Sequence, residues 1–256
     1  MRPPLSTFLL LSVGMFFLGV VLGGTVSFSI PRALRREFIS LASLQNCGYL
    51  PMNITLFLLE PSLRDQFLLY IFLYLLGFNI FMWSVGAFFI FRKKGEKFEV
   101  KSLFTPPIFS VIVALFFVYT GFRRFLPGVI MAPLQLIGET TFPLSMIILG
   151  VWLAKNKTKD LFLHFSPILK VLIIKLIVIP FMFFLAVLKF EVYSLFGLFI
   201  ILEASMPSAA SLPIVVNFRK GNSEFISRGV FFTHLASIIT IPLWIELFLR
   251  ISGFQL

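Results

Sequence analysis

The sequence is poor in charged residues: Asp, Glu, Lys and Arg together make up 13% of its 256 residues. Soluble globular domains carry about 25%. The chain is also 59% hydrophobic and contains 35 phenylalanines. This is more apolar side chain than a water-soluble protein of this length can bury in its core. The composition therefore excludes a soluble globular protein and predicts an all-α polytopic membrane protein.

Residues that carry chemistry are scarce too. A single cysteine, Cys47, excludes a disulfide within the chain. The two histidines, His164 and His234, lie far apart and fit no metal-ligand spacing. No phosphate-binding loop, HExxH sequence or nucleophile elbow is present. An intramembrane enzyme would need a nucleophile–base pair or a metal cluster, so we expect no enzymatic activity, no cofactor and no metal.

Long apolar runs, by contrast, fill the chain. A spanning helix needs about 20 mostly apolar residues, and this criterion predicts eight transmembrane helices, at about 6–30, 38–59, 66–91, 105–122, 130–154, 165–188, 192–218 and 225–250. The net charge of +11 would indicate nucleic-acid binding in a soluble protein. Here the basic residues gather in alternate loops and set topology. We expect a multi-pass protein of the cell inner (plasma) membrane, with both termini facing away from the cytoplasm and no nucleic-acid partner.

Two of these predicted spans contain helix breakers and polar side chains. The first, in the stretch SLQNCGYLPMNITLF, is predicted to break at Gly48–Pro51; the second contains Glu203, Ser205, Pro207, Ser208, Ser211 and Pro213. Proline costs a helix interior about 3 kcal/mol or more. Broken backbone at membrane depth is tolerated where it is buried in protein or lines a wet cavity. One alternative is a pair of ordinary proline kinks, but two broken, polar spans favour the midplane site of a transporter.

Charged and amide side chains inside the spans are the candidate functional residues. Glu203 is a mid-span carboxylate, either a proton-coupling group or a structural hydrogen-bonding group. Lys175 is the counter-charge of Glu203, a group that attracts an anionic substrate, or a side chain that extends to the cytoplasmic face. Gln45, Asn46 and Asn53 offer neutral donors and acceptors, for a substrate or for bonds between helices.

Several stretches resemble one family of carriers. LQNCGYLPMNI resembles the fourth-helix motif of the auxin efflux carrier family, which includes bacterial malonate and malate permease-like proteins. FTPPIFSVIVALFFVYTG and IGETTFPLSMIILGVWLA resemble its sixth and seventh helices, and EASMPSAASLPIVVNFRKGNSEFISRGVFFTHLASIITIPLWIELF its ninth and tenth. The similarity spans essentially the whole chain, and it rests on the order and spacing of these stretches together.

This resemblance implies a fold of ten helices in two inverted five-helix repeats, related to bile acid sodium symporters, whose interrupted fourth and ninth helices cross near the binding site. Asn46 and Gly48 match the Asn-x-Gly of the family, Pro207 its ninth-helix crossover proline, and Lys175 a frequently basic position in the eighth helix. Pro51 departs from the later Gly-x-Pro of the family, which leaves the crossover geometry of the first broken span open by about half a turn.

The number of helices also departs from the family. Residues 1–104 are expected to form an incomplete first repeat of three helices, without the first two of the family, and residues 105–256 a full second repeat of five. By resemblance, the missing pair belongs to the scaffold, and the moving transport core is whole. A mis-called start site, a natural truncation and a degenerate relative are the alternatives.

We therefore predict a secondary active transporter of a small organic anion such as a carboxylate, coupled to protons through Glu203. The alternative is a truncated membrane protein that does not transport and has a structural or regulatory role. Besides the anion and the lipid bilayer, a proton or sodium is an expected partner, and the oligomeric state is open, with a homodimer among the possibilities. The predicted substrate-binding residues are Gln45, Asn46, Asn53, Lys175, Ser205 and Ser208, and the crossover residues are Gly48, Pro51 and Pro207.

Overall fold

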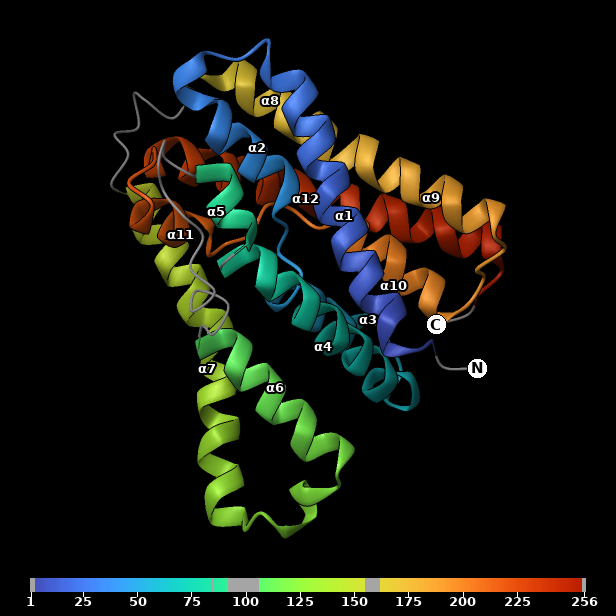
Figure 1. The fold of residues 1–256 in the computed structure, drawn as a ribbon. Coiled ribbons are helices and arrows are strands. Elements are labelled where there is room, and N and C mark those ends of the chain that lie inside the picture. Colours follow the sequence, from blue (N-terminus) through green and yellow to red (C-terminus); the bar gives the residue numbers. More distant parts are fainter. Residues whose placement is uncertain (1–2, 84, 92–105, 155–161, 255–256) are drawn as a thin grey trace.

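The computed structural model describes residues 3–83, 85–91, 106–154 and 162–254 (Figure 1). Its long helices and half-helices are α1 (Leu5–Ser27), α2 (Arg35–Ser43), α3 (Tyr49–Leu58), α4 (Pro61–Trp83), α5 (Val85–Phe91), α6 (Pro106–Tyr119), α7 (Gly128–Ala154), α8 (Phe165–Ile173), α9 (Ile179–Lys189), α10 (Leu195–Ala204), α11 (Leu212–Phe218) and α12 (Ser223–Ser252). Shorter helical segments are η1 (Arg32–Leu34), η3 (Phe122–Phe125) and the π-helical η5 (Ile174–Val178).

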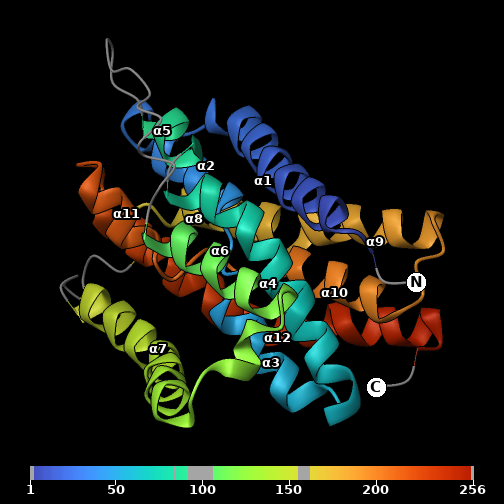
Figure 2. The ribbon, with the colours of Figure 1, turned by 60° about the horizontal axis from the view of Figure 1, so that its bottom comes forward.

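The helices confirm an all-α polytopic membrane protein. Each of the eight predicted ranges contains a helix or a pair of helices. Within the described residues, four helical stretches are long and apolar enough to cross a membrane on their own: Leu5–Ser27, Pro61–Trp83, Phe165–Lys189 and Ser223–Ser252. Both termini lie at the same end of the bundle, whereas α6 and α7 form a hairpin that diverges from the other helices (Figures 1 and 2).

The first span predicted to be broken is broken, but earlier than expected. Helix α2 ends at Ser43 and α3 begins at Tyr49, with Leu44 in extended conformation after α2. The predicted break at Gly48–Pro51 is therefore right at Gly48, which lies in the break, and wrong at Pro51. Pro51 lies in the first turn of α3, where backbone N–H groups have no partner within the helix. The N–H that proline lacks is therefore not missed there.

The second broken span is interrupted where its sequence predicts. Helix α10 ends at Ala204 and α11 begins at Leu212, so Pro207 lies in the break. Pro213 is the second residue of α11, again in a first turn that tolerates proline.

A third helix is continuous but changes its winding at Lys175. Residues Ile174–Val178 form one π-helical turn between α8 and α9, and the Ile179 N–H bonds the carbonyl five residues earlier. Pro180, next in the chain, has no N–H for the carbonyl of Leu176, and the Trp244 indole donates to that carbonyl instead, at 2.9 Å. Such π-helical turns are frequent at functional sites.

Close backbone packing holds α1 against α2. A Cβ added at Gly19 would lie 2.5 Å from Ser43 Cα and 2.7 Å from the Ala42 carbonyl oxygen. A Cβ at Gly23 would lie 3.0 Å from Ala42 Cβ. The two glycines therefore allow α1 to cover the last turn of α2, directly before the first break.

Candidate functional site

The two breaks meet and bond to each other in the middle of the bundle. The Asn46 N–H donates to the Pro207 carbonyl at 2.8 Å, and the Ala209 N–H donates to the Leu44 carbonyl at 3.0 Å. Gln45 and Ser208 are paired between these bonds in an antiparallel bridge. Backbone groups that the interrupted helices leave unpaired thus satisfy each other, as unwound backbone away from water requires.

The Gln45 side chain is the centre of a buried polar cluster. Its Nε2 donates to the Tyr74 hydroxyl at 2.8 Å and to Glu203 Oε2 at 3.3 Å. Its Oε1 accepts from Lys175 Nζ at 3.2 Å. The Tyr74 hydroxyl in turn donates to Met15 Sδ at 3.2 Å. Five segments distant in sequence therefore meet at one amide.

Two ionisable side chains in this cluster, a lysine and a glutamate, are withdrawn from solvent. Lys175 is 1% exposed and Glu203 is fully buried. The ammonium bonds Gln45 inside the bundle, so Lys175 does not extend to the cytoplasmic face. Glu203 Oε1 has no hydrogen-bond partner among the described residues. Buried charges are costly unless they are paired, and here the two charges share a neutral side chain between them.

Asn46, beside Gln45, bonds a histidine of α12. Its Nδ2 lies 3.1 Å from His234 Nε2. The other ring nitrogen, Nδ1, lies 2.8 Å from the Val230 carbonyl oxygen. Because a carbonyl only accepts, Nδ1 carries the proton of the neutral ring, and Nε2 accepts from Asn46.

A cavity of about 240 Å³, which we call the crossover pocket, opens beside the crossing. The breaks and the first residues of α3 form one part of it, and α4 and α6 the rest. Its lining is neutral among the described residues, and its amide and hydroxyl side chains are Gln45, Asn46, Tyr49, Asn79, Ser110 and Ser211. Gly48 and Tyr49 bring the start of α3 into the lining, and no side chain caps this helix. Uncapped N–H groups at a helix start favour an anion.

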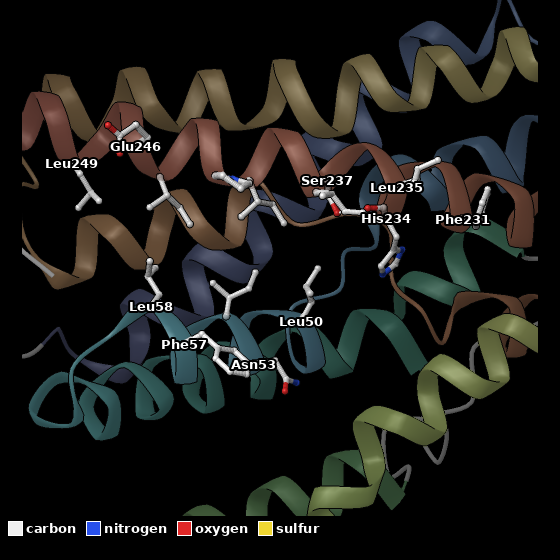
Figure 3. Close-up of a pocket in the computed structure, with 15 residues that line it drawn as sticks. Leu50, Asn53, Phe57, Leu58, Phe231, His234, Leu235, Ser237, Glu246 and Leu249 are labelled. Carbon is white, nitrogen blue, oxygen red and sulfur yellow. The ribbon is translucent and has the colours of Figure 1, made fainter.

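A larger, apolar cavity lies between α3 and α12. It has a volume of about 830 Å³, and Figure 3 shows Leu50, Phe57 and Leu58 of α3 facing the side chains of α12. His234 lines this α3–α12 groove, while its partner Asn46 lines the crossover pocket. Asn46 and His234 therefore lie between the crossover pocket and the α3–α12 groove.

The predicted site residues are brought together only in part. Gln45, Asn46 and Gly48 line the crossover pocket, and Lys175 and Glu203 bond Gln45 behind it. Asn53 instead lines the α3–α12 groove, where its Nδ2 donates to the Tyr49 carbonyl at 2.7 Å.

The two predicted serines form structural bonds outside the pocket lining. Ser205 Oγ donates to the Leu202 carbonyl at 2.9 Å, and Ser208 Oγ donates to the Leu41 carbonyl at 2.7 Å. The Ser205 bond is a local one, of the kind that hydroxyls near helix ends commonly form, whereas the Ser208 bond joins the second break to α2. The Ser208 N–H bonds Thr233 Oγ1 at 3.3 Å, which ties the second break to α12.

Sequence reasoning missed Tyr74 and His234. Tyr74 lies in an aromatic-rich span in which nothing separates it from residues that only pack. His234 was considered as a metal ligand and not as a partner of an amide. At His234 the available signal was an ionisable residue inside an apolar span.

Comparison with known proteins gives two matches. The profile of a family described as "Membrane transport protein" matches residues 90–245, more than half of the chain. The chain is 28% identical over 140 residues to "Uncharacterized transporter MJ1031" of Methanocaldococcus jannaschii. That similarity covers 54% of this chain and 44% of the relative. No solved structure matches.

Proposed function

Because this chain belongs to the membrane transport protein family, we propose that it is a secondary active transporter of a small organic anion such as a carboxylate. The observation that carries the proposal is the crossing of two broken spans beside a cavity of about 240 Å³ whose lining includes amide and hydroxyl side chains. Unwound backbone at the crossing is the kind of structure from which transporters form midplane sites.

The lining of the crossover pocket supports an anion as the substrate. Asn46 provides an amide without charge, and Gly48 and Tyr49 bring the start of α3, which no side chain caps, into the lining. A helix start offers unpaired N–H groups and the positive end of the helix dipole to an anion. The buried side chain of Lys175 lies one hydrogen bond behind Gln45. Donors without a permanent charge in the lining would bind an anion weakly enough to release it on the other side of the membrane.

The buried cluster behind the pocket supports proton coupling. Ionised Lys175 and Glu203 together carry no net charge. A proton on Glu203 leaves one positive charge beside Gln45, whose side chain also lines the pocket. This charge would attract the anion, so proton and anion would bind together. Glu203 would then be the coupling group and Lys175 a fixed counter-charge.

Movement of the substrate requires that the crossing be exposed to each side of the membrane in turn. We propose that the two repeats, residues 1–104 and 105–256, each supply one broken span. The helices other than α6 and α7, with both broken spans among them, would move as a rigid core against a scaffold formed by α6 and α7. The chain is a multi-pass membrane protein, and we place it in the inner (plasma) membrane.

Counterflow in proteoliposomes tests the proposal. The purified protein is reconstituted with one unlabelled acid inside, and uptake of the same radiolabelled acid is followed for acetate, lactate, malonate and succinate. Transient accumulation of at least one acid above the level in protein-free vesicles is expected. Absence of accumulation for all four would contradict transport of small carboxylates.

A further inference from the structure

His234 is the side chain that determines how Asn46 faces the crossover pocket. Its Nε2 lies 3.1 Å from Asn46 Nδ2, and its Nδ1 is held by the Val230 carbonyl at 2.8 Å. Thr233, the preceding residue, accepts from the Ser208 N–H, so this turn of α12 is fixed against both broken spans. The imidazole therefore has little freedom to turn, and the amide adapts to the ring.

The bond between ring and amide depends on the protonation of the ring. Nδ1 keeps its proton in both states because its partner is a carbonyl. In the neutral ring Nε2 accepts, so it requires Asn46 Nδ2, as observed. In the imidazolium Nε2 donates, so it requires Asn46 Oδ1, and the amide must rotate by half a turn about its last bond.

We infer that His234 is a positioning residue that turns the Asn46 amide between an acceptor and a donor toward the crossover pocket. With the ring neutral, one N–H of Nδ2 bonds His234 and Oδ1 is left for the pocket, where this acceptor oxygen disfavours an anion. With the ring protonated, Oδ1 is committed and the two N–H groups of Nδ2 are left for a carboxylate. Binding of an organic anion is thereby linked to a proton on His234. This inference rests on the proposed function, because it takes the ligand of the pocket to be an anion.

Other titratable groups on the elements around α12 have different partners. Lys175 and Glu203 bond Gln45, Lys170 bonds Ser29, and Glu37 bonds the Asn222 N–H. Glu139 of α7 accepts from Gln135, and Glu246 of α12 pairs with Arg250. Cys47, in the first break, is buried, as is Arg228, an earlier residue of α12. The two ring nitrogens of His234 bond the Asn46 amide and the Val230 carbonyl, and neither of these groups is charged.

Transport kinetics separate this role from that of Glu203. The experiment uses Glu203→Gln protein and the acid, among acetate, lactate, malonate and succinate, that the protein exchanges. We measure the Michaelis constant for this acid in counterflow, with equal pH on both sides of the membrane. It should rise with pH, approaching about tenfold per pH unit once the ring is mostly neutral, because the competent fraction falls by that factor. His234→Gln, which keeps an amide partner but takes no proton, should remove this dependence of the Michaelis constant on pH. His164→Gln, at an exposed position, should preserve it.

Nitrogen NMR of the ring provides a test that does not depend on transport. His164→Gln leaves His234 as the one histidine of the chain, so ¹⁵N-histidine labelling reports it alone. The neutral ring should carry its proton on Nδ1. Addition of the exchanged acid at fixed pH should raise the imidazolium fraction, by the reciprocity of linked binding, and Asn46→Ala should abolish that response.

The outcomes distinguish this inference from the proposed function. A proton on Nε2 of the neutral ring, or an imidazolium fraction that does not respond to the exchanged acid, would overturn the role of His234 while transport stands. A Michaelis constant that keeps its pH dependence in His234→Gln would do the same. If none of the four acids is exchanged, the proposed function fails, and this inference fails with it.

Discussion

Lys175 and Glu203 are joined through a single side chain: the Gln45 amide accepts from the ammonium at 3.2 Å and donates to the carboxylate at 3.3 Å. Both charges belong to the described residues, and no direct ion pair links them there. Gln45 lies in one broken span, Glu203 directly precedes the break of the other, and Lys175 lies in a π-helical turn. A change in the charge of Glu203 therefore alters the electrostatic potential where the two broken spans cross.

Replacement of Glu203 by glutamine should reduce the stimulation of carboxylate uptake by an inward proton gradient to the part that a proton on His234 supplies. The substituted amide has nearly the same shape and can still bond Gln45, so the protein should elute as the folded wild type does in size-exclusion chromatography. Uptake is compared in proteoliposomes with and without the gradient. Glu246→Gln is the matched control, because Glu246 is exposed and pairs with Arg250 on the surface of α12. Equal stimulation in Glu203→Gln and wild type would remove Glu203 from the coupling mechanism.

Charge removal at Lys175 and at Glu203 should not be additive. Lys175→Met and Glu203→Gln each leave one buried charge without its counter-charge, at a cost on the order of 3 kcal/mol. The double variant carries neither charge and should recover most of this loss. Melting temperatures in detergent for the four proteins measure the interaction. A double variant as unstable as the sum of its singles would show that the two charges do not stabilise each other.

Gly19→Ala should destabilise the packing of α1 on α2. The new Cβ would lie 2.5 Å from Ser43 Cα, so the helices must separate, at a cost of about 1–3 kcal/mol. Gly14→Ala on the same helix is the control, since a Cβ there meets nothing within 4 Å. The melting temperature should fall for the first variant and stay level or rise for the second. A similar change in both would contradict the close approach of the two helices.

The sequence predicted the architecture better than the contacts of the site. Prolines and amides within apolar runs identify both broken spans, and ionisable side chains in mid-span identify Glu203 and Lys175. Each of these features is costly in lipid, so it can be recognised in the sequence without knowing which residues it contacts. The predicted first break was wrong at Pro51 because proline suits the first turn of a helix as well as it suits a break.

Other features of the site arise only from tertiary packing. Tyr74 and His234 acquire their roles from Gln45 and Asn46, which are distant in sequence. Asn53 was grouped with Asn46 because both are amides of one span. In the structure α3 carries Asn53 away from the crossing and into the α3–α12 groove.

The most direct measurement is counterflow of the exchanged carboxylate by two variants of one span, Asn46→Ala and Asn53→Ala. Asn46 lines the crossover pocket and Asn53 the groove. If transport passes through the crossing, Asn46→Ala should raise the Michaelis constant by about tenfold or more, the loss expected for a hydrogen bond to a charged ligand, while Asn53→Ala stays within about twofold of wild type. A loss confined to Asn53→Ala, with Asn46→Ala unchanged, would contradict the crossing as the site of transport.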